Sequence, residues 1–169
     1  EITFRLIPKP ETSRTLSVTF SSIRAAAECV SAIMCRGIVP AKLELIERAC
    51  AAGSRRIEVA SFVHPGRVPQ MADAEAVVAG LAPREDVEFS ALVLNERGYD
   101  RALAAGVRAL NSVVSATDAF GERNQGMPVD EAVRAVSSMR KRAEADGVRF
   151  TVTISVAFGC PFEGEVALE

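Results

Sequence analysis

The sequence predicts an α/β fold in which parallel β-strands alternate with helices. Three helical segments end in the same way, each closing on a glycine (Gly53, Gly106 or Gly147) that a run of strand-forming residues follows. Helix–glycine–strand joins that recur along a chain indicate parallel βα units. The strand segments are almost continuously apolar, as expected for a parallel sheet covered by helices. These observations predict about four to five parallel βα units.

The first clear unit begins at Pro40, a residue that suits the start of a helix. Apolar residues then recur at helical spacing as far as Cys50, and the strand Arg56–Phe62 follows Gly53. The later units are predicted by the same periodicities and by the prolines and glycines between them. They comprise helices at 72–81, 96–105 and 129–145, and strands at 87–94, 107–115 and 150–158.

The last of these helices has the strongest boundaries. Pro128 precedes its first turn, which contains Asp130 and Glu131, and Gly147 follows its end. Acidic side chains near a helix N-terminus are favourable because of the helix dipole, and glycine adopts the left-handed conformation that commonly ends a helix. We therefore expect a long, well-defined helix before the last strand.

Residues 1–37 form a poorly readable N-terminal segment, and we assign 38–169 to the predicted α/β domain. Alternation over 15–20 allows a strand, and the alanine-rich stretch 23–34 allows a helix. The residues by themselves permit a small open α/β sheet as well as part of a barrel. A closed (β/α)8 barrel needs eight strands and typically ~250 residues, so this chain of 169 residues would supply about half of one.

Composition excludes several classes of protein. The net charge is −2 and no basic block occurs, so we expect no nucleic-acid partner. No apolar run approaches the ~18 residues of a membrane span, so we expect no membrane segment. The four cysteines form no Cys-x-x-Cys pair, which argues against a zinc knuckle and favours reduced thiols in a cytoplasmic protein.

The most informative stretch is Arg56–Asp73, a predicted strand that runs into a proline-containing loop. Glu58 and Ser61 are polar residues in this apolar strand. In parallel sheets the loop end of each strand is where sites form, and a buried carboxylate is costly unless it is paired or used. Glu58 is therefore either a functional residue or the ion-pair partner of an arginine such as Arg56 or Arg84.

A series of residues over roughly 39–165 follows one known pattern. It comprises Ile57–Val63, Pro65, Val68–Met71, Asp73, Asn95, Gly98, Ala105–Gly106, Ser115–Thr117, Phe120, Asn124, Glu131 and Gly159–Gly164. In order and spacing these residues resemble the 3-hydroxy-3-methylglutaryl-coenzyme A lyase family. That family consists of metal-dependent carbon–carbon lyases on a (β/α)8 barrel, so the resemblance implies a partial TIM barrel.

The implied reaction converts 3-hydroxy-3-methylglutaryl-CoA to acetyl-CoA and acetoacetate, a step of leucine degradation. The implied partner is an acyl-CoA thioester. Related carboxyltransferase-type barrels, such as the isopropylmalate and homocitrate synthases, are an alternative, and the Val68–Met71 loop favours the lyase over them.

The resemblance implies that Glu58 is catalytic. It places Asn124, in an expected loop, near the acyl thioester, where an amide can both donate and accept hydrogen bonds; a turn residue would also suit Asn. Ser61, Gln70 and Ser155 are weaker substrate-binding candidates, because each lies at or beyond a strand end and could equally cap a helix. Cys160 is expected to be packed rather than nucleophilic.

The family's cofactor is a divalent metal, Mg2+ or Mn2+, held by an Asp in an Arg-Asp-Gly stretch and by a His-x-His pair. Counted back from Val39, the Arg-Asp pair falls on Cys29 and Val30, and the chain has one histidine, His64, expected in an exposed loop. We therefore predict no metal ligands in this chain and a truncated or inactive member of the family.

The alternative to an enzyme is a non-catalytic half barrel that associates with itself or with another chain. Open strand edges and uncovered apolar surface promote such association. On this ground we expect a homo-oligomer.

Overall fold

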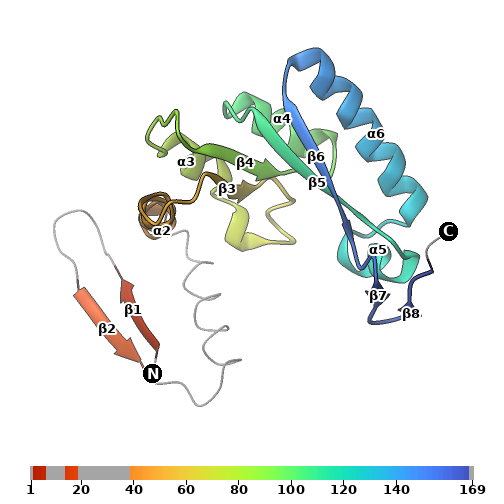
Figure 1. Cartoon of the computed structure of the whole chain (residues 1–169), viewed down its shortest axis with the longest axis horizontal. Helices are drawn as coiled ribbons and strands as arrows, with labels where there is room; N and C mark the ends of the chain where they lie inside the picture. The colour runs from red at the N-terminus through yellow and green to blue at the C-terminus, as the bar shows by residue number, and fades with distance from the viewer. Residues whose placement is uncertain (1, 7–13, 19–38, 168–169) are drawn as a thin grey trace.

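The computed structural model describes residues 2–6, 14–18 and 39–167 (Figure 1). β1 (Ile2–Leu6) and β2 (Arg14–Val18) form an antiparallel hairpin. The remaining elements are α2 (Val39–Ala51), β3 (Arg56–Ser61), η1 (Pro69–Met71), α3 (Ala74–Ala79), β4 (Glu88–Leu92), α4 (Glu96–Ala104), β5 (Ala109–Ser115), α5 (Asp118–Asn124), α6 (Val129–Asp146), β6 (Arg149–Ser155), β7 (Gly159–Cys160) and β8 (Gly164–Glu165).

A four-stranded parallel sheet in the order β3-β4-β5-β6 organises the described chain. β5 and β6 pair along their whole length, from Ala109 opposite Arg149 to Ser115 opposite Ser155. The predicted α/β class with four parallel strands is thus confirmed. The strand expected near the N-terminus exists as β2, but it pairs with β1 in a separate sheet. The helix predicted at 23–34 lies outside the described residues.

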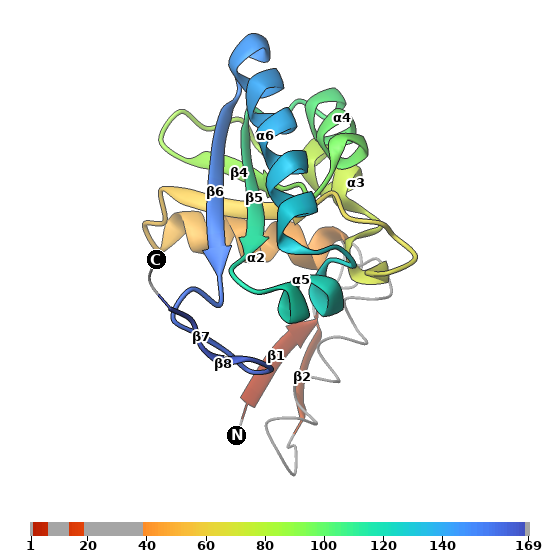
Figure 2. The same cartoon turned by 90° about the vertical axis from the view of Figure 1, so that its right-hand side faces the viewer.

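Helices cover one face of this sheet, and the main core lies beneath them. Figure 2 shows α6 and α4 lying along the same side of β5 and β6. Leu110 and Val114 of β5 are buried together with Tyr99 of α4 and Met139 of α6. A second cluster joins α2 and α3 to the strands through residues such as Val77. A parallel sheet with its helices packed on one face is the layer arrangement of a barrel wall, in which the helices lie outside.

The last strand of the sheet is less well covered than its neighbour. Phe150 of β6 packs against the main core, but the residues two and four positions further on, Val152 and Ile154, are 39% and 63% exposed. β6 is an edge of the sheet, so one side of its backbone has no neighbouring strand among the described residues.

Two predicted segments differ from the structure. The helix expected at 72–81 is shorter, comprising α3 alone, and the 3-10 helix η1 precedes it. The stretch Phe120–Asn124, expected as a loop, forms the last five of the seven residues of helix α5. Gly121 in this helix allows a close contact, because a Cβ at this position would lie 2.7 Å from the Met127 carbonyl oxygen. Asn124 is accordingly the last residue of a helix.

The C-terminal part of the fold also differs from the expected strand at 150–158. β6 ends at Ser155, and Val156 has a positive φ of 51°. The chain then turns into the β7–β8 hairpin. Among the described helices, none is both long enough and apolar enough to cross a membrane.

The substitution Gly121→Ala tests the close contact between Gly121 of α5 and the Met127 backbone. Alanine in a helix is normally about 1 kcal/mol more favourable than glycine. Here the added methyl group would collide with backbone at Met127, so we expect a loss of about 1–3 kcal/mol of unfolding free energy. Urea denaturation measures the effect. A gain in stability would show that no close contact constrains this position.

Tyr99 offers a second test, because it is the only tyrosine. Its ring is fully buried, its hydroxyl donates to Asp146 at 2.8 Å, and the Arg142 guanidinium lies 4.5 Å from its centroid. Burial, followed by the Asp146 hydrogen bond, raises the pKa of Tyr99 from 10.0 to about 12. The stability that this residue contributes is therefore complete below pH 10 and is lost as the pH rises toward 12.

The titration is followed by tyrosinate absorbance in native protein and in urea. We expect a midpoint near 12 in the native protein and near 10 in urea. Asp146→Asn should lower the native midpoint, whereas Asp130→Asn, an exposed change on the same helix, should leave it in place. A native midpoint at 10 would mean that the ring is not buried as described.

Candidate active site

Polar side chains occupy the middle of the sheet face opposite the helices. Glu58 of β3 lies in register with Ser90 of β4, and Asn111 projects beside them from β5. The Asn111 amide Nδ2 donates to Glu58 Oε2 at 2.6 Å and to Ser90 Oγ at 3.1 Å. The amide therefore fixes the orientation of the carboxylate through one of its oxygens.

This network decides between two readings of Glu58. The arginines that could have paired with it are engaged elsewhere: Arg56 lies 3.4 Å from Glu88, and Arg84 lies 2.7 Å from Glu47. The side chain of Glu58 is exposed on the sheet face opposite the helices (the concave face). The catalytic role of Glu58 stays a prediction, but its carboxylate is oriented and open to a ligand.

The amino ends of the strands on the same face carry a structural ion-pair network. Arg149 of β6 contacts both carboxylate oxygens of Glu88 at 2.7 Å and donates to the Thr151 hydroxyl at 2.9 Å. A bidentate arginine–carboxylate pair has favourable geometry. Because these side chains bind one another, they have a structural role at the amino end of the sheet. The carboxylate that is open to a ligand, Glu58, lies further along the strands.

The predicted serines lie at the opposite, carboxyl ends of the strands. Ser61 is the last residue of β3, and its buried hydroxyl oxygen has no hydrogen-bond partner among the described residues. Ser155 is the last residue of β6 and donates to the Ser115 hydroxyl at 3.3 Å. An unpartnered buried hydroxyl is unfavourable, so Ser61 is the better placed of the two to gain from contact with a ligand.

Gln70 and Asn124 lie in the segments that follow β3 and β5. Gln70 is in η1, where its backbone carbonyl oxygen accepts a hydrogen bond from Lys42 Nζ at 2.5 Å. Asn124 is exposed at the end of α5. The guanidinium of Arg67 joins these two segments by donating to the Gln125 carbonyl at 3.2 Å. The structure therefore brings the segments together, and the substrate-binding roles of Gln70 and Asn124 stay predictions.

The glycine-rich signature at 159–164 folds against α5. Glu163 accepts a hydrogen bond from the Ala119 N–H at 2.9 Å, near the start of this helix. Cys160 is buried, as expected, and the Thr117 hydroxyl donates to its sulfur at 3.1 Å. Burial opposes ionisation of the thiol, but this hydrogen bond and those from the Phe162 and Glu163 backbone outweigh it and lower the pKa of Cys160. A packed, hydrogen-bonded cysteine agrees with a structural role.

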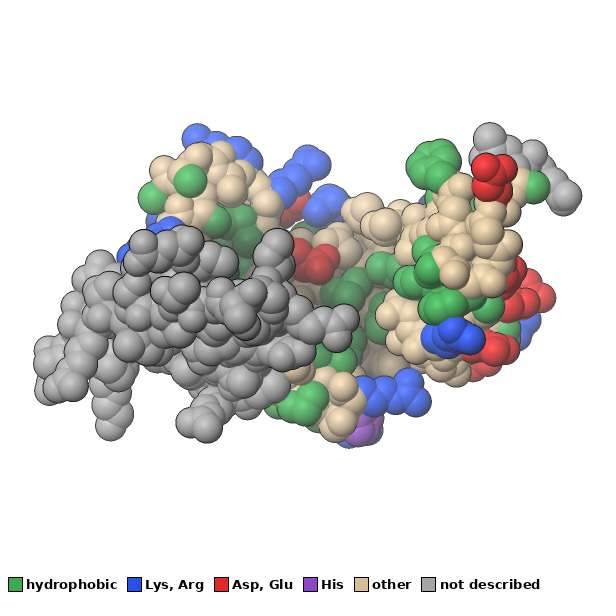
Figure 3. Space-filling model, turned by 90° about the horizontal axis from the view of Figure 1, so that it is seen from below, with side chains coloured by type: hydrophobic (Ala, Val, Ile, Leu, Met, Phe, Trp, Pro, Cys, Tyr) green, Lys and Arg blue, Asp and Glu red, His purple; other side chains and the backbone are tan. Residues whose placement is uncertain are grey.

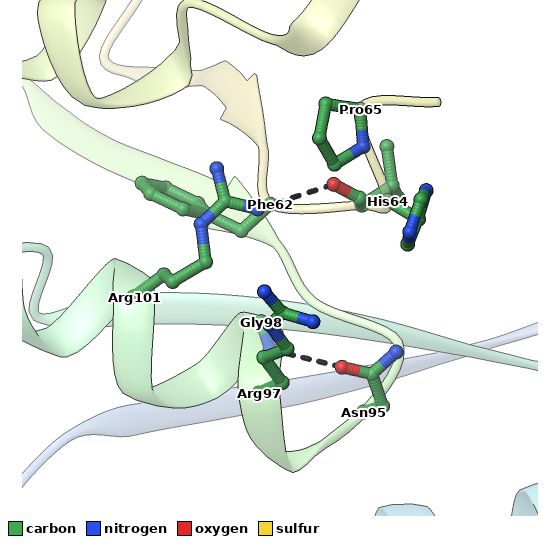
Figure 4. A pocket seen from close by; sticks show the side chains of 8 residues that line it. Phe62, His64, Pro65, Asn95, Arg97, Gly98 and Arg101 are labelled. Atoms are coloured by element: carbon green, nitrogen blue, oxygen red, sulfur yellow. Dashed lines mark hydrogen bonds between the residues drawn. The ribbon is translucent and has the colours of Figure 1, made fainter. Parts of the chain in front are cut away.

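Sequence reasoning missed a cavity of about 310 Å3 beside the carboxyl end of β3 (Figure 4). It is lined by Phe62, Val63, His64, Pro65, Asn95, Arg97, Gly98 and Arg101. The Asn95 side chain accepts a hydrogen bond from the Gly98 N–H at 2.9 Å and so caps α4. Gly98 is required there, because a Cβ would lie 2.5 Å from the Phe62 carbonyl oxygen. The Asn95 and Gly98 positions in the family-like pattern were the available signal.

The described residues do not fit the divalent metal of the resembled family. None of them forms a group of three or more His, Cys, Asp or Glu side chains suited to a metal ion. The hydrogen-bonded neighbours of Glu58 are an amide and a hydroxyl, and the single histidine lies in the loop beyond β3. One carboxylate leaves too few strong ligands to hold Mg2+ or Mn2+.

Comparison with known proteins extends this picture. The chain is 40% identical to an (R)-citramalyl-CoA lyase of Chloroflexus aurantiacus over 138 residues, which cover 76% of this chain and 44% of the relative. It is 36% identical to a 3-hydroxy-3-isohexenylglutaryl-CoA/hydroxymethylglutaryl-CoA lyase of Pseudomonas aeruginosa, covering 74% of this chain and 42% of that protein. The chain thus spans under half the length of these curated relatives.

Solved structures give the same result. A hydroxymethylglutaryl-CoA lyase from Pseudomonas aeruginosa superposes with a TM-score of 0.72 at 36% identity, covering 76% of this chain and 43% of that one. An HMG-CoA lyase from Acinetobacter baumannii, in complex with coenzyme A and 3-methylmalate, superposes with a TM-score of 0.72 at 30% identity and covers 76% and 42%. The sheet and its helices therefore have the fold of part of a lyase TIM barrel.

A family model described as FAD linked oxidases, C-terminal domain, matches residues 9–145. This range includes residues 9–37, which precede the family-like pattern of residues 39–165. It ends within α6 and so leaves out β6, which pairs with β5 along seven residues. The lyase relatives therefore describe the folded unit better than this family model does. The described α/β fold is that of part of a hydroxymethylglutaryl-CoA lyase, and by its sequence over 9–145 the chain belongs to the family of FAD linked oxidases, C-terminal domain.

Proposed function

We propose that this chain supplies the substrate-handling part of a carbon–carbon lyase that acts on a 3-hydroxyacyl-CoA thioester. The observation that carries the proposal is the Glu58 carboxylate, oriented by Asn111 on the concave face of a lyase-type sheet. The class of substrate is supported by relatives that are lyases of citramalyl-CoA and hydroxymethylglutaryl-CoA, and by a solved relative that holds coenzyme A. We take 3-hydroxy-3-methylglutaryl-CoA as the first substrate to test.

The reaction requires removal of the proton from the tertiary hydroxyl of the substrate. The carbon–carbon bond then breaks, the hydroxyl carbon becomes the ketone of acetoacetate, and the departing thioester enolate takes up a proton to give acetyl-CoA. In this chain the Glu58 carboxylate would bind and orient the substrate, with Asn111 holding its Oε2. The Ser61 and Ser155 hydroxyls and the Gln70 and Asn124 amides would contact the acyl-CoA near the strand ends.

The metal of the family would polarise the substrate oxygens, but the described residues do not fit it. The polarising group, and a base for the hydroxyl proton, would therefore come from outside the described residues or from another chain. A cytoplasmic location and a place in leucine degradation complete the proposal, and both stay predictions.

The test replaces the corresponding segment of the Pseudomonas aeruginosa lyase by residues 39–165 of this chain. The recipient then supplies the parts of the barrel that this chain does not span. We expect the chimera to release acetyl-CoA from 3-hydroxy-3-methylglutaryl-CoA or citramalyl-CoA. Glu58→Gln should lower kcat by about 10²-fold or more, since the charge that orients the substrate is lost. The exposed control Glu85→Gln should retain activity.

The 169-residue chain is assayed in parallel, with Mn2+ and with chelator. We expect no acetyl-CoA release in either case, because the donor set is incomplete. Chelator-sensitive turnover by this chain alone would overturn the account of missing ligands. Equal activity of the chimera before and after the Glu58→Gln substitution would remove Glu58 from the site.

A second candidate function is non-catalytic association, as expected for a half barrel. It is favoured by the open edge of β6 and by exposed apolar side chains in and after this strand, Ile154 at 63% and Phe158 at 87%. Exposed strand edges and large apolar patches commonly mark association surfaces. Under this reading the chain is a homo-oligomer, and a monomeric mass in sedimentation would count against it.

A further inference from the structure

Among the described residues, the cavity beside β3 is lined by positively charged side chains and by none that is negatively charged. Two of its lining side chains, Arg97 and Arg101, are cationic, His64 adds an imidazole, and no carboxylate of the described chain lines it. Figure 4 shows Arg97 and Arg101 extending from α4 toward the loop that carries His64 and Pro65. Figure 3 shows the single histidine at the surface beside Lys or Arg side chains. The cavity is thus a concave, cationic feature of the surface.

The two arginines differ in how they are held. Arg101 pairs with Glu75 at 2.7 Å, donates to the Val63 carbonyl at 3.2 Å and lies 5.5 Å from the centroid of the Phe62 ring. The Arg101 hydrogen bond lowers the pKa of Glu75, so this pair is charged at neutral pH. Arg101 is therefore a fixed part of the wall, with its charge already balanced.

The guanidinium of Arg97 is different, because it makes no hydrogen bond or ion pair within the part of the chain that the structure describes. Most other arginines in 39–167 have such a partner, including Arg101, Arg142 and Arg149. His64 adds a donor: its Nδ1 accepts the Gly66 N–H at 3.1 Å, which leaves the proton of the neutral ring on Nε2. The Arg97 guanidinium, whose charge has no paired carboxylate among these residues, and the His64 ring N–H therefore border the same cavity.

We propose that this cavity binds a phosphate group through Arg97 and His64. The planar fork of donors on arginine matches the oxygens of a phosphate, and the Asn95 side chain already occupies the Gly98 N–H of α4, so the side chains rather than the helix end carry the site. A cavity of about 310 Å3 holds a phosphate ester but not a whole coenzyme.

The source of the phosphate depends on the proposed function. The cavity begins one residue after Ser61 and four after Glu58, roughly 13 Å of extended chain from the catalytic candidate. If the chain handles an acyl-CoA, a phosphate of the coenzyme would occupy the cavity while the acyl end reaches the concave face. If it does not, the ligand is free phosphate or a small phosphate ester.

The test is a calorimetric titration of the purified chain with inorganic phosphate and, separately, with coenzyme A. Arg97→Ala should weaken binding of whichever probe the wild type binds by about tenfold or more, since a charge-assisted bidentate contact is lost. Arg140→Ala is the matched control, because Arg140 is an exposed arginine of α6 paired only with Glu144. His64→Ala should weaken binding by a smaller factor.

The outcomes separate the two sources. Binding of coenzyme A without measurable binding of phosphate supports the site and assigns it to the coenzyme, whereas equal binding of both supports it as a site for free phosphate. Absence of binding of either probe to the folded wild type, or equal losses in Arg97→Ala and Arg140→Ala, would overturn the proposal. An Arg97 effect together with an inactive chimera would leave this site in place and remove only the proposed function.

Discussion

The structure depends on burial of one face of the parallel sheet beneath α4 and α6. Leu110 and Val114 of β5 meet Met139 of α6 in that interface, and the apolar area removed from water there is the main source of stability. Because that face supplies the core, the opposite face is free to carry polar groups. Glu58 and Asn111 occupy it without being forced into an apolar interior.

The sequence predicted the parts of the fold that local rules control. Glycines such as Gly147, which has a left-handed φ of 65°, end helices at predictable places, and apolar runs identify the strands between them. α5 was missed because Gly121 is set by a contact with Met127 that no local pattern reveals. The Glu58–Asn111 hydrogen bond joins residues 53 positions apart, so only the register of β3, β4 and β5 could show it.

The two family assignments divide the chain unequally. The range of the oxidase family model begins at residue 9 and ends within α6, whereas the lyase comparisons cover about three quarters of the chain. A folded unit that stopped at residue 145 would lose β6, which pairs with β5 along seven residues. The lyase relation therefore explains the described sheet.

The same reasoning separates two kinds of functional group. Groups that orient a substrate can lie on adjacent strands, as Glu58 and Asn111 do, because register alone brings them within hydrogen-bond distance. A metal site needs several ligands that converge from around a barrel, and four strands that end at the open edge of β6 provide one suitably placed carboxylate. Ile154 of this edge strand is 63% exposed, so the described residues leave apolar surface uncovered there. A metal site would therefore need ligands from outside the described residues.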